Sequence, residues 1–255
     1  MASKKDVGSV EIVKVDKLQL KVCVIGTSPI ILNRMSEKVR QELLLPRGKK
    51  NAAEKQASLK HNPVEEFNSS PYRIEDEKAP TYLGIMASAF KGAMRTAALD
   101  LPGSSKAQIG RLVYVVGDLV PIYGKPYLHM SVTRSADISR TPDVRTRAII
   151  PKWAALVEIN FVSPILRANT VLNLLSASGI TSGVGDWRPE KGKGDYGQYR
   201  IATPDDPEFV EIVKNGGRGI QIKAMETAEP YDLESRELLA WFDVEATRRG
   251  FQIAQ

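Results

Sequence analysis

Apolar residues alternate with polar ones near the start of the chain and recur at helical spacing further along. Residues 10–25 are rich in β-branched side chains at nearly alternating positions, which is typical of a strand, and a Gly-Thr-Ser-Pro segment ends it. Residues 36–45 predict a helix in which Ser36 serves as the N-cap. Residues 84–99 predict a second helix, whose many small side chains allow another group to approach closely.

The rest of the chain continues this mixture of strands and helices. The patterns predict strands at residues 111–122, 153–162 and 196–202 and helices at residues 169–177 and 207–215. Gly117 is expected to bend the first of these strands, and Gly179 to close the first of these helices. The tail after Gly219 has enough apolar residues to pack on the core, namely Leu238, Leu239, Trp241 and Phe242.

Without its insertions, the chain has the element order strand, helix, strand, strand, helix, strand. This is the split βαβ order of ferredoxin-like folds, which the RNA-recognition module shares. We therefore predict an α+β fold with a ferredoxin-like, RRM-like palm, formed by one domain at residues 8–255 that follows a tail at residues 1–7. Two basic insertions interrupt the palm, a loop at residues 46–82 that is partly mobile without ligand and a thumb at residues 123–150. The predicted helix at 36–45 must also belong to an insertion for this count to hold.

Charge and cysteine content limit the classes of function. Thirty-six Lys and Arg residues against thirty Asp and Glu give a formal charge of +6, which favours a polyanionic partner. The single cysteine, Cys23 in an apolar strand segment, and only two histidines exclude a disulfide framework and a zinc site of the Cys and His type. No segment has the apolar length of a signal peptide or a membrane span, so we expect a cytoplasmic protein without membrane contact.

Two stretches indicate where an anion binds. In the predicted helix at 84–99, Lys91 and Arg95 are four residues apart and share one face, and the small residues beside them leave room for a phosphate. The alternative is an amphipathic helix with two solvated cations. Residues 183–197 hold five glycines with cations and aromatic rings, so backbone amides can cradle a phosphate; the alternative is a flexible connection. The candidate contacts in this loop are Trp187, Arg188, Lys191 and Lys193.

Both stretches resemble parts of a known superfamily. The segment GIMASAFKGAMRTA resembles the small-Ser-x-Lys-Gly-x-x-Arg helix of RAMP proteins, and the loop at 183–197 resembles their C-terminal glycine-rich loop. RAMP proteins include the backbone subunits of CRISPR effector complexes, whose palm and inserted thumb polymerise along a guide RNA. The resemblance implies that Lys91 and Arg95 contact guide phosphates, that the loop lies against the RNA backbone, and that residues 125–147 form the thumb.

The composition of residues 125–147 agrees with a thumb that contacts RNA. Cations neutralise phosphates and tyrosines stack on unpaired bases, and this segment is basic with tyrosines nearby. Its cations are Lys125, Arg134, Arg140, Arg145 and Arg147, its acids are Asp137 and Asp143, and the tyrosines are Tyr123 and Tyr127. The alternative is a solvated surface hairpin.

The loop after the first strand departs from the family pattern. RAMP proteins that cut RNA carry an acidic residue there, whereas residues 26–34 hold no Asp or Glu. Asn33 and Arg34 can contact a phosphate or a base in this loop, but they do not form a metal-binding set. His61 and His129 stand alone, and no nucleophile and base are suitably spaced. We therefore expect a non-catalytic protein without a metal or a cofactor.

These observations predict a nucleic-acid-binding backbone subunit of an antiviral effector complex. It is expected to bind single-stranded guide RNA, with single-stranded DNA as the other option. It is also expected to form head-to-tail homo-oligomers along the strand and to leave any cleavage to other effector subunits. Two alternatives stay open: a stand-alone, phage-encoded protein of the same fold that binds single strands or interferes with defence, and an endoribonuclease.

Overall fold

The computed structural model describes residues 14–35, 44, 61–103, 105–134, 142–192 and 194–251. These residues form an α+β structure with ten strands, seven helices and one 3-10 turn, η1 (Pro189–Lys191). The strands are β1 (Asp16–Gly26), β2 (Ile30–Leu32), β3 (Tyr72–Arg73), β4 (Leu83–Met86), β5 (Val113–Val115), β6 (Leu119–Tyr123), β7 (Tyr127–Arg134), β8 (Pro142–Ile150), β9 (Ala154–Ser163) and β10 (Tyr199–Ala202). The helices are α3 (Pro63–Ser69), α4 (Ala87–Ala97), α5 (Lys106–Leu112), α6 (Ala168–Thr181), α7 (Pro207–Asn215), α8 (Arg218–Thr227) and α9 (Leu233–Arg248).

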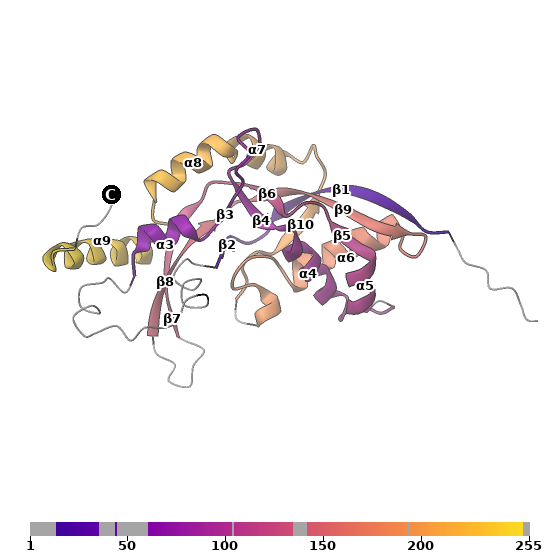
Figure 1. The fold of residues 1–255 in the computed structure, drawn as a ribbon, viewed down its shortest axis with the longest axis horizontal. Coiled ribbons are helices and arrows are strands. Elements are labelled where there is room, and N and C mark those ends of the chain that lie inside the picture. The colour runs from indigo at the N-terminus through magenta and orange to yellow at the C-terminus, as the bar shows by residue number, and fades with distance from the viewer. Residues whose placement is uncertain are drawn as a thin grey trace, which may run out of the picture.

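β9 is the central strand of the larger antiparallel sheet. One edge of β9 pairs with β1 along its whole length, from Asp16 opposite Ser163 to Ile25 opposite Ala154. The other edge is shared by two short strands, β5 near the end of β9 and β6 near its start. The strand order is β10-β1-β9-β6-β4-β3, with β5 beside β9, and the sheet curls along this order (Figure 1).

Helices cover both faces of this sheet. Successive residues of a strand point to opposite faces, so Val24 of β1 belongs to the main core with α4 and α6, while the adjacent Ile25 packs against Ile212 of α7. α4 and α6 lie side by side under the sheet in Figure 1, and α7 and α8 lie above it. The main core is therefore the layer between the sheet and the α4–α6 pair.

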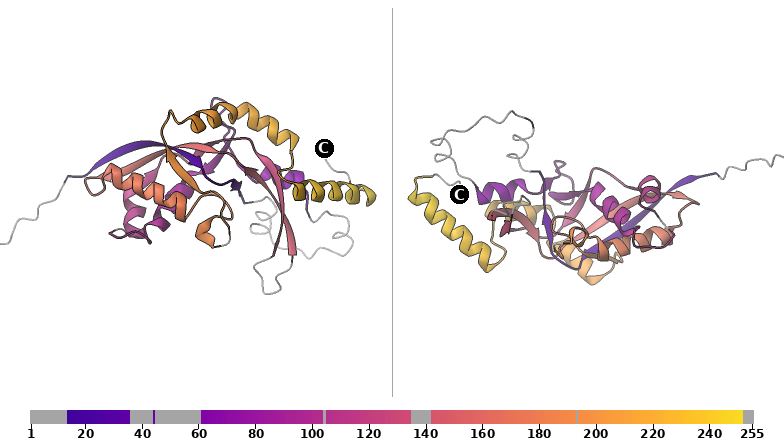
Figure 2. Two further views of the ribbon diagram at one scale, coloured as in Figure 1. Left: turned by 180° about the vertical axis from the view of Figure 1, so that it is seen from behind. Right: turned by 90° about the horizontal axis from the view of Figure 1, so that it is seen from below.

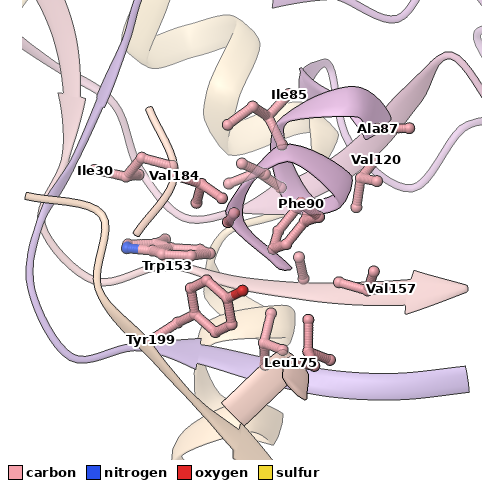
Figure 3. Close-up of a cluster of buried hydrophobic side chains, with 14 of the residues drawn as sticks. Ile30, Ile85, Ala87, Phe90, Val120, Trp153, Val157, Leu175, Val184 and Tyr199 are labelled. Atoms are coloured by element: carbon pink, nitrogen blue, oxygen red, sulfur yellow. The ribbon is translucent and has the colours of Figure 1, made fainter. Parts of the chain in front are cut away.

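Three aromatic rings form the centre of the main core (Figure 3). The ring of Tyr199 on β10 meets Phe90 of α4 and Trp153 edge to face, with centroid distances of 5.6 and 6.1 Å. Such pairs contribute about 0.5–1.5 kcal/mol beyond the burial of their area. The buried Tyr199 hydroxyl hydrogen-bonds to the Ser178 hydroxyl at 2.6 Å, and burial raises the pKa of Tyr199, so this hydroxyl stays protonated.

β7 and β8 form a hairpin that projects from the larger sheet (Figure 2). With β2 they make a second antiparallel sheet of three strands, in which Leu32 lies opposite Ala148. α3 packs along β8, and the start of α9 packs on β7. There the Met130 N–H donates to the Ser235 hydroxyl at 3.0 Å.

The structure confirms the mixed α+β class and most of the predicted elements. The strands expected at 10–25, 153–162 and 196–202 correspond to β1, β9 and β10, although residues 10–13 lie outside the described part of the chain. The helix expected at 207–215 is α7 with the same bounds. The helix expected at 169–177 is α6, but the prediction that Gly179 closes it is wrong: α6 continues to Thr181, and Gly179 lies inside it where a Cβ would overlap the backbone of Tyr199. The helix predicted at 36–45 lies outside the described residues, apart from Leu44.

Two predicted boundaries are wrong. Residues 84–99 begin as β4 before α4 starts, because Gly84, Ile85 and Met86 pair with β6. Residues 111–122 contain the end of α5 followed by two short strands, since the chain turns at Gly117 and β5 and β6 pair with β9 at different places. Gly117 has a φ of 81°, so the predicted bend itself is confirmed.

Two further predictions, the loop at 46–82 and the packing of the C-terminal tail, are wrong in part. The loop expected at 46–82 is in part helical, because α3 is anchored by Phe67, whose side chain is completely buried; residues 46–60 lie outside the described part. In the tail, Leu238 and Leu239 pack against the core as expected, but Trp241 is 65% exposed because α9 contacts the hairpin near its N-terminal end. Among the described helices, none combines the length and the apolar character that a membrane span needs.

Candidate nucleic-acid interface

A cleft of about 360 Å³ opens where three distant segments of the chain meet. Asn33 comes from the residues after β2, Arg95 from α4, and Arg188 from the loop between α6 and β10. The loop reaches β2 because the Asp186 N–H donates to the Ile31 carbonyl oxygen at 2.9 Å. Three of the residues predicted from the sequence to contact nucleic acid therefore line one hollow, which we call the α4 cleft.

Arg95 is the cation that α4 contributes to this cleft. Its side chain passes Gly110 of α5, where an added Cβ would lie only 3.0 Å from the Arg95 Nε atom. The Nε atom is buried and finds no hydrogen-bond partner among the described residues. A buried N–H without an acceptor is costly, so Arg95 is held beside Gly110 at a cost in free energy.

Lys91 is placed differently, although it shares the helix with Arg95. Its ammonium group lies 4.4 Å from the centre of the Tyr114 ring on β5, and Lys91 does not line the α4 cleft. The cation–π contact fixes this side chain toward β5. The two cations that the sequence places on one helical face thus have separate neighbours.

Arg188 is held in the α4 cleft by an acidic residue. Its guanidinium donates to Glu190 from both Nε and a terminal nitrogen at 2.7 Å, and to the Gly185 carbonyl oxygen at 2.9 Å. The Thr96 hydroxyl of α4 donates to the other Glu190 oxygen at 2.9 Å. Burial raises the pKa of Glu190, but the hydrogen bonds from Arg188 and Thr96 outweigh this and lower it overall. Glu190 therefore stays ionised and links the loop to α4.

Close packing explains four of the five glycines of the loop at 183–197, and Gly192 is the exception. Gly183, Gly185 and Gly197 have positive φ values of 65°, 88° and 72°, and a Cβ at Gly185 would lie 2.7 Å from the Ile31 carbonyl oxygen. The loop amides of Val184, Asp186 and Gly197 donate to backbone carbonyl oxygens. Since these amides are used in folding the loop, it presents side chains to a ligand more than a cradle of free N–H groups.

Trp187 and Lys191 are the other described candidates of the loop. Trp187 is 38% exposed and has a φ of 53°, which is unusual for a residue with a side chain. The Asp186 carboxylate accepts its N–H at 3.0 Å and supports this conformation. Lys191 ends η1 and is exposed, whereas Lys193 lies outside the described residues.

The hairpin brings Arg147 to the edge of the α4 cleft. Leu32 of β2 pairs with Ala148 of β8, so Asn33 and Arg147 are the next residues along the two paired strands. Burial lowers the pKa of Arg147, and the carboxylate of Asp186 partly compensates for this. The Arg147 Nε atom is buried, again with no hydrogen-bond partner within the described chain.

The remaining basic candidates are spread along the hairpin and the strand beside it. Arg145 is exposed on β8, two residues before Arg147 and therefore on the same face of the strand. Arg134 ends β7, and Arg140 lies outside the described residues. Arg34 packs its guanidinium 5.8 Å from the ring centre of Tyr72, which itself lines the cleft.

Sequence reasoning missed four charged or aromatic residues that line the cleft: Tyr72, Lys106, Asp186 and Glu190. Glu190 pairs with Arg188 only two residues away, but no local signal shows that the pair lies in a cleft, and only the tertiary structure brings Asp186 near Arg147. His61 is also not isolated, since its Nδ1 lies 2.7 Å from Glu66 and its Nε2 3.0 Å from Asp143. The hydrogen bond with Glu66 raises the pKa of His61, and burial opposes the shift.

The chemistry of the cleft suits an anion with several oxygens. Its walls combine the guanidinium groups of Arg95 and Arg188 with small residues of α4, and the buried Nε–H of Arg95 has no acceptor among the described residues. In the described part of the chain, no group of three or more His, Cys, Asp or Glu residues is placed to bind a metal ion. The sequence matches no protein-family model and no curated protein.

Proposed function

We propose that this protein binds single-stranded nucleic acid in the α4 cleft, with RNA as the preferred strand. The observation that carries the proposal is the pair of arginines Arg95 and Arg147, whose buried Nε–H groups find no partner in the described part of the chain. Both belong to arginines at the cleft or its edge, where Asn33 and Arg188 also lie. Phosphate oxygens are the acceptors that arginine contacts best in nucleic acids, and they would bind the guanidinium groups at the cleft.

The strand arrangement supports an RNA-recognition type of palm. In space, β10, β1, β9 and β5 lie in this order, and α4 and α6 cover the same face. These six elements follow the split βαβ order that ferredoxin-like folds share. The additional strands β6, β4 and β3 and the projecting β7–β8 hairpin would then be insertions, with the hairpin as the thumb.

The proposed role is that of a non-catalytic backbone subunit, similar to those of RAMP-type CRISPR effector complexes. Copies would associate head to tail in the cytoplasm along the guide strand, and other subunits would supply any cleavage. A contact between unlike surfaces of identical copies does not close on itself and gives filaments. Electron microscopy with and without RNA tests this part: regular filaments that need RNA support a backbone subunit, whereas bound but discrete particles support a stand-alone binding protein.

Titration of labelled single-stranded RNA by fluorescence anisotropy at several salt concentrations tests the cleft. Arg95→Gln and Arg147→Gln should each weaken binding about tenfold or more, because each removes a charge-assisted contact worth about 1.5–3 kcal/mol. Each should also reduce the slope of log affinity against log salt by about 0.7, the value for one phosphate of a single strand.

Arg200→Gln is the matched control for these two variants. Arg200 is exposed on β10 and is paired with Asp206 and Glu208, away from the α4 cleft. Its replacement should leave affinity and salt slope nearly unchanged. If the Arg95 and Arg147 variants remain folded and bind with the wild-type affinity and slope, the α4 cleft is not the phosphate site. Failure of the wild-type protein to bind any single strand would reject the function itself.

A further inference from the structure

A second hollow, of about 460 Å³, lies where the hairpin leaves the larger sheet. Tyr127 at the start of β7 and Tyr231 just before α9 form two of its walls, and Ile212 of α7 adds an apolar surface. The two tyrosine rings have centroids 6.4 Å apart and are inclined by 59°. Flat aromatic walls around an apolar space are suited to a planar ring, so we call this the tyrosine hollow.

The floor of the tyrosine hollow is fixed by backbone contacts. The Gly124 N–H donates to the Gly216 carbonyl oxygen at 2.9 Å, and a Cβ at Gly216 would overlap Gly124. The buried amide of Gln221 donates to the Gly124 carbonyl oxygen at 3.1 Å. Because the chain segments are held together in this way, the hollow is formed in advance of any ligand, which lowers the entropic cost of binding.

The wall that carries Tyr231 is attached to the hairpin. The Leu128 N–H donates to the Glu229 carbonyl oxygen and the Tyr231 N–H to the Leu128 carbonyl oxygen, both at 2.8 Å. The segment between α8 and α9 therefore follows β7 as an added strand would. The two tyrosines are thus kept in fixed positions relative to each other.

The two lysines of the hollow have different surroundings. The Lys125 ammonium donates to Glu229 at 2.6 Å and lies 4.6 Å from the centre of the Tyr127 ring, so its charge is already compensated. Lys152 lines the hollow, is exposed, and forms no ion pair with another described residue. Among the residues that the structure describes, the hollow therefore offers aromatic walls and, at Lys152, a cation without an ion pair, and a nucleotide can use both.

The tyrosine hollow and the α4 cleft are connected along one face of the hairpin. Residues directly opposite each other in an antiparallel pair share a face, and Arg147 lies opposite His129. The His129 ring in turn meets the Tyr231 ring edge to face at 5.8 Å. His129 is two residues from Tyr127, a rise of about 7 Å along the strand. A strand with a phosphate at Arg147 would have a neighbouring base within reach of Tyr231.

We propose that the tyrosine hollow receives one base of the strand whose phosphates occupy the α4 cleft. The base would stack on Tyr231 and meet the inclined ring of Tyr127 at its edge, and the phosphate next to it would lie at Lys152. This inference rests on the proposed function, because it adds a base-binding site to the same interface.

Crosslinking of the wild-type protein tests the inference directly. RNA with 5-iodouracil in place of uracil forms covalent bonds with stacked aromatic side chains on irradiation, and mass spectrometry identifies the peptides. Crosslinks to the peptides of Tyr127 or Tyr231 are expected. Tyr231→Ala should weaken RNA binding about tenfold, within the range for loss of one stacked base, without changing the salt slope, because no charge is removed. Tyr231→Phe should bind nearly as wild type.

Tyr114→Ala is the matched control, since Tyr114 is an exposed tyrosine of β5 that does not line the hollow. Its affinity for RNA should stay within a factor of about three of the wild type, a shift well under 1 kcal/mol. If RNA binds but gives no crosslink to Tyr127 or Tyr231, and folded Tyr231→Ala binds normally, the base site is rejected while the phosphate site stands. If wild-type protein binds no strand, the function and the base site are rejected together.

Discussion

Gln221 of α8 holds together the elements around the tyrosine hollow, and its replacement should be strongly destabilising. Its side-chain oxygen accepts the N–H groups of Tyr82 and Leu83 at 2.8 and 3.0 Å. Its amide nitrogen donates to the carbonyl oxygens of Ile122 and Gly124 at 2.7 and 3.1 Å. Gln221→Met keeps a similar length and volume but removes all four hydrogen bonds. Two N–H groups lose their acceptor at about 1–3 kcal/mol each, so we expect the free energy of unfolding to fall by about 2–6 kcal/mol.

Urea unfolding followed by circular dichroism measures this loss. Whole domains are stable by only about 5–15 kcal/mol, so the expected change is a large shift of the midpoint. Gln198→Met is the matched control, because the Gln198 side chain donates a single exposed hydrogen bond, to the Ile180 carbonyl oxygen at 2.9 Å. It should cost less than about 1 kcal/mol. Equal midpoints for the two variants would refute the reasoning that buried amide bonds of Gln221 join α8 to the sheet.

Two further predictions concern the glycine-rich loop and the histidine beside the hairpin. Gly197→Ala should lower the free energy of unfolding by clearly more than Gly192→Ala. Both glycines have positive φ, but only a Cβ at Gly197 would overlap another backbone atom. Equal losses of stability in urea unfolding would contradict this. The hydrogen bonds of His61 to Glu66 and Asp143 raise its pKa in the folded protein. This should add stability that is fully present below the unfolded pKa of about 6.5 and is lost as the pH rises through the raised folded pKa. His61→Gln should abolish this part of the pH profile of unfolding, and an unchanged profile would exclude His61 as its source.

Local sequence patterns predicted an element correctly where the apolar residues of that element follow a single periodicity. α7 is an example, because Pro207 and Asp206 mark its start and its Phe209 and Ile212 pack against the sheet. The strand predicted at 111–122 failed for the opposite reason. Its β-branched residues belong to two strands that pair with different parts of β9, and no periodicity reveals where a partner strand is divided.

The same distinction applies to the candidate site. Arg95 and Arg188 were predicted from residue type and spacing, and both line the α4 cleft. Tyr231 was not predicted. It lies beside Tyr127 only because its segment pairs with β7, about a hundred positions earlier in the chain. Lys91 was predicted to contact nucleic acid together with Arg95, but its spacing from Arg95 does not reveal that its ammonium group lies over the Tyr114 ring.

The local electrostatics of the α4 cleft bear on affinity more directly than the overall charge of +6. Arg188 and Glu190 already neutralise each other, so an incoming phosphate would compete with a carboxylate for Arg188. Within the described residues, Arg95 and Arg147 have no such competitor at their Nε atoms. Burial lowers the pKa of Arg147, which means that its charged form is destabilised before a ligand binds. A phosphate at this position would relieve that penalty, and the binding free energy would then depend on these two arginines far more than on the exposed cations of the hairpin.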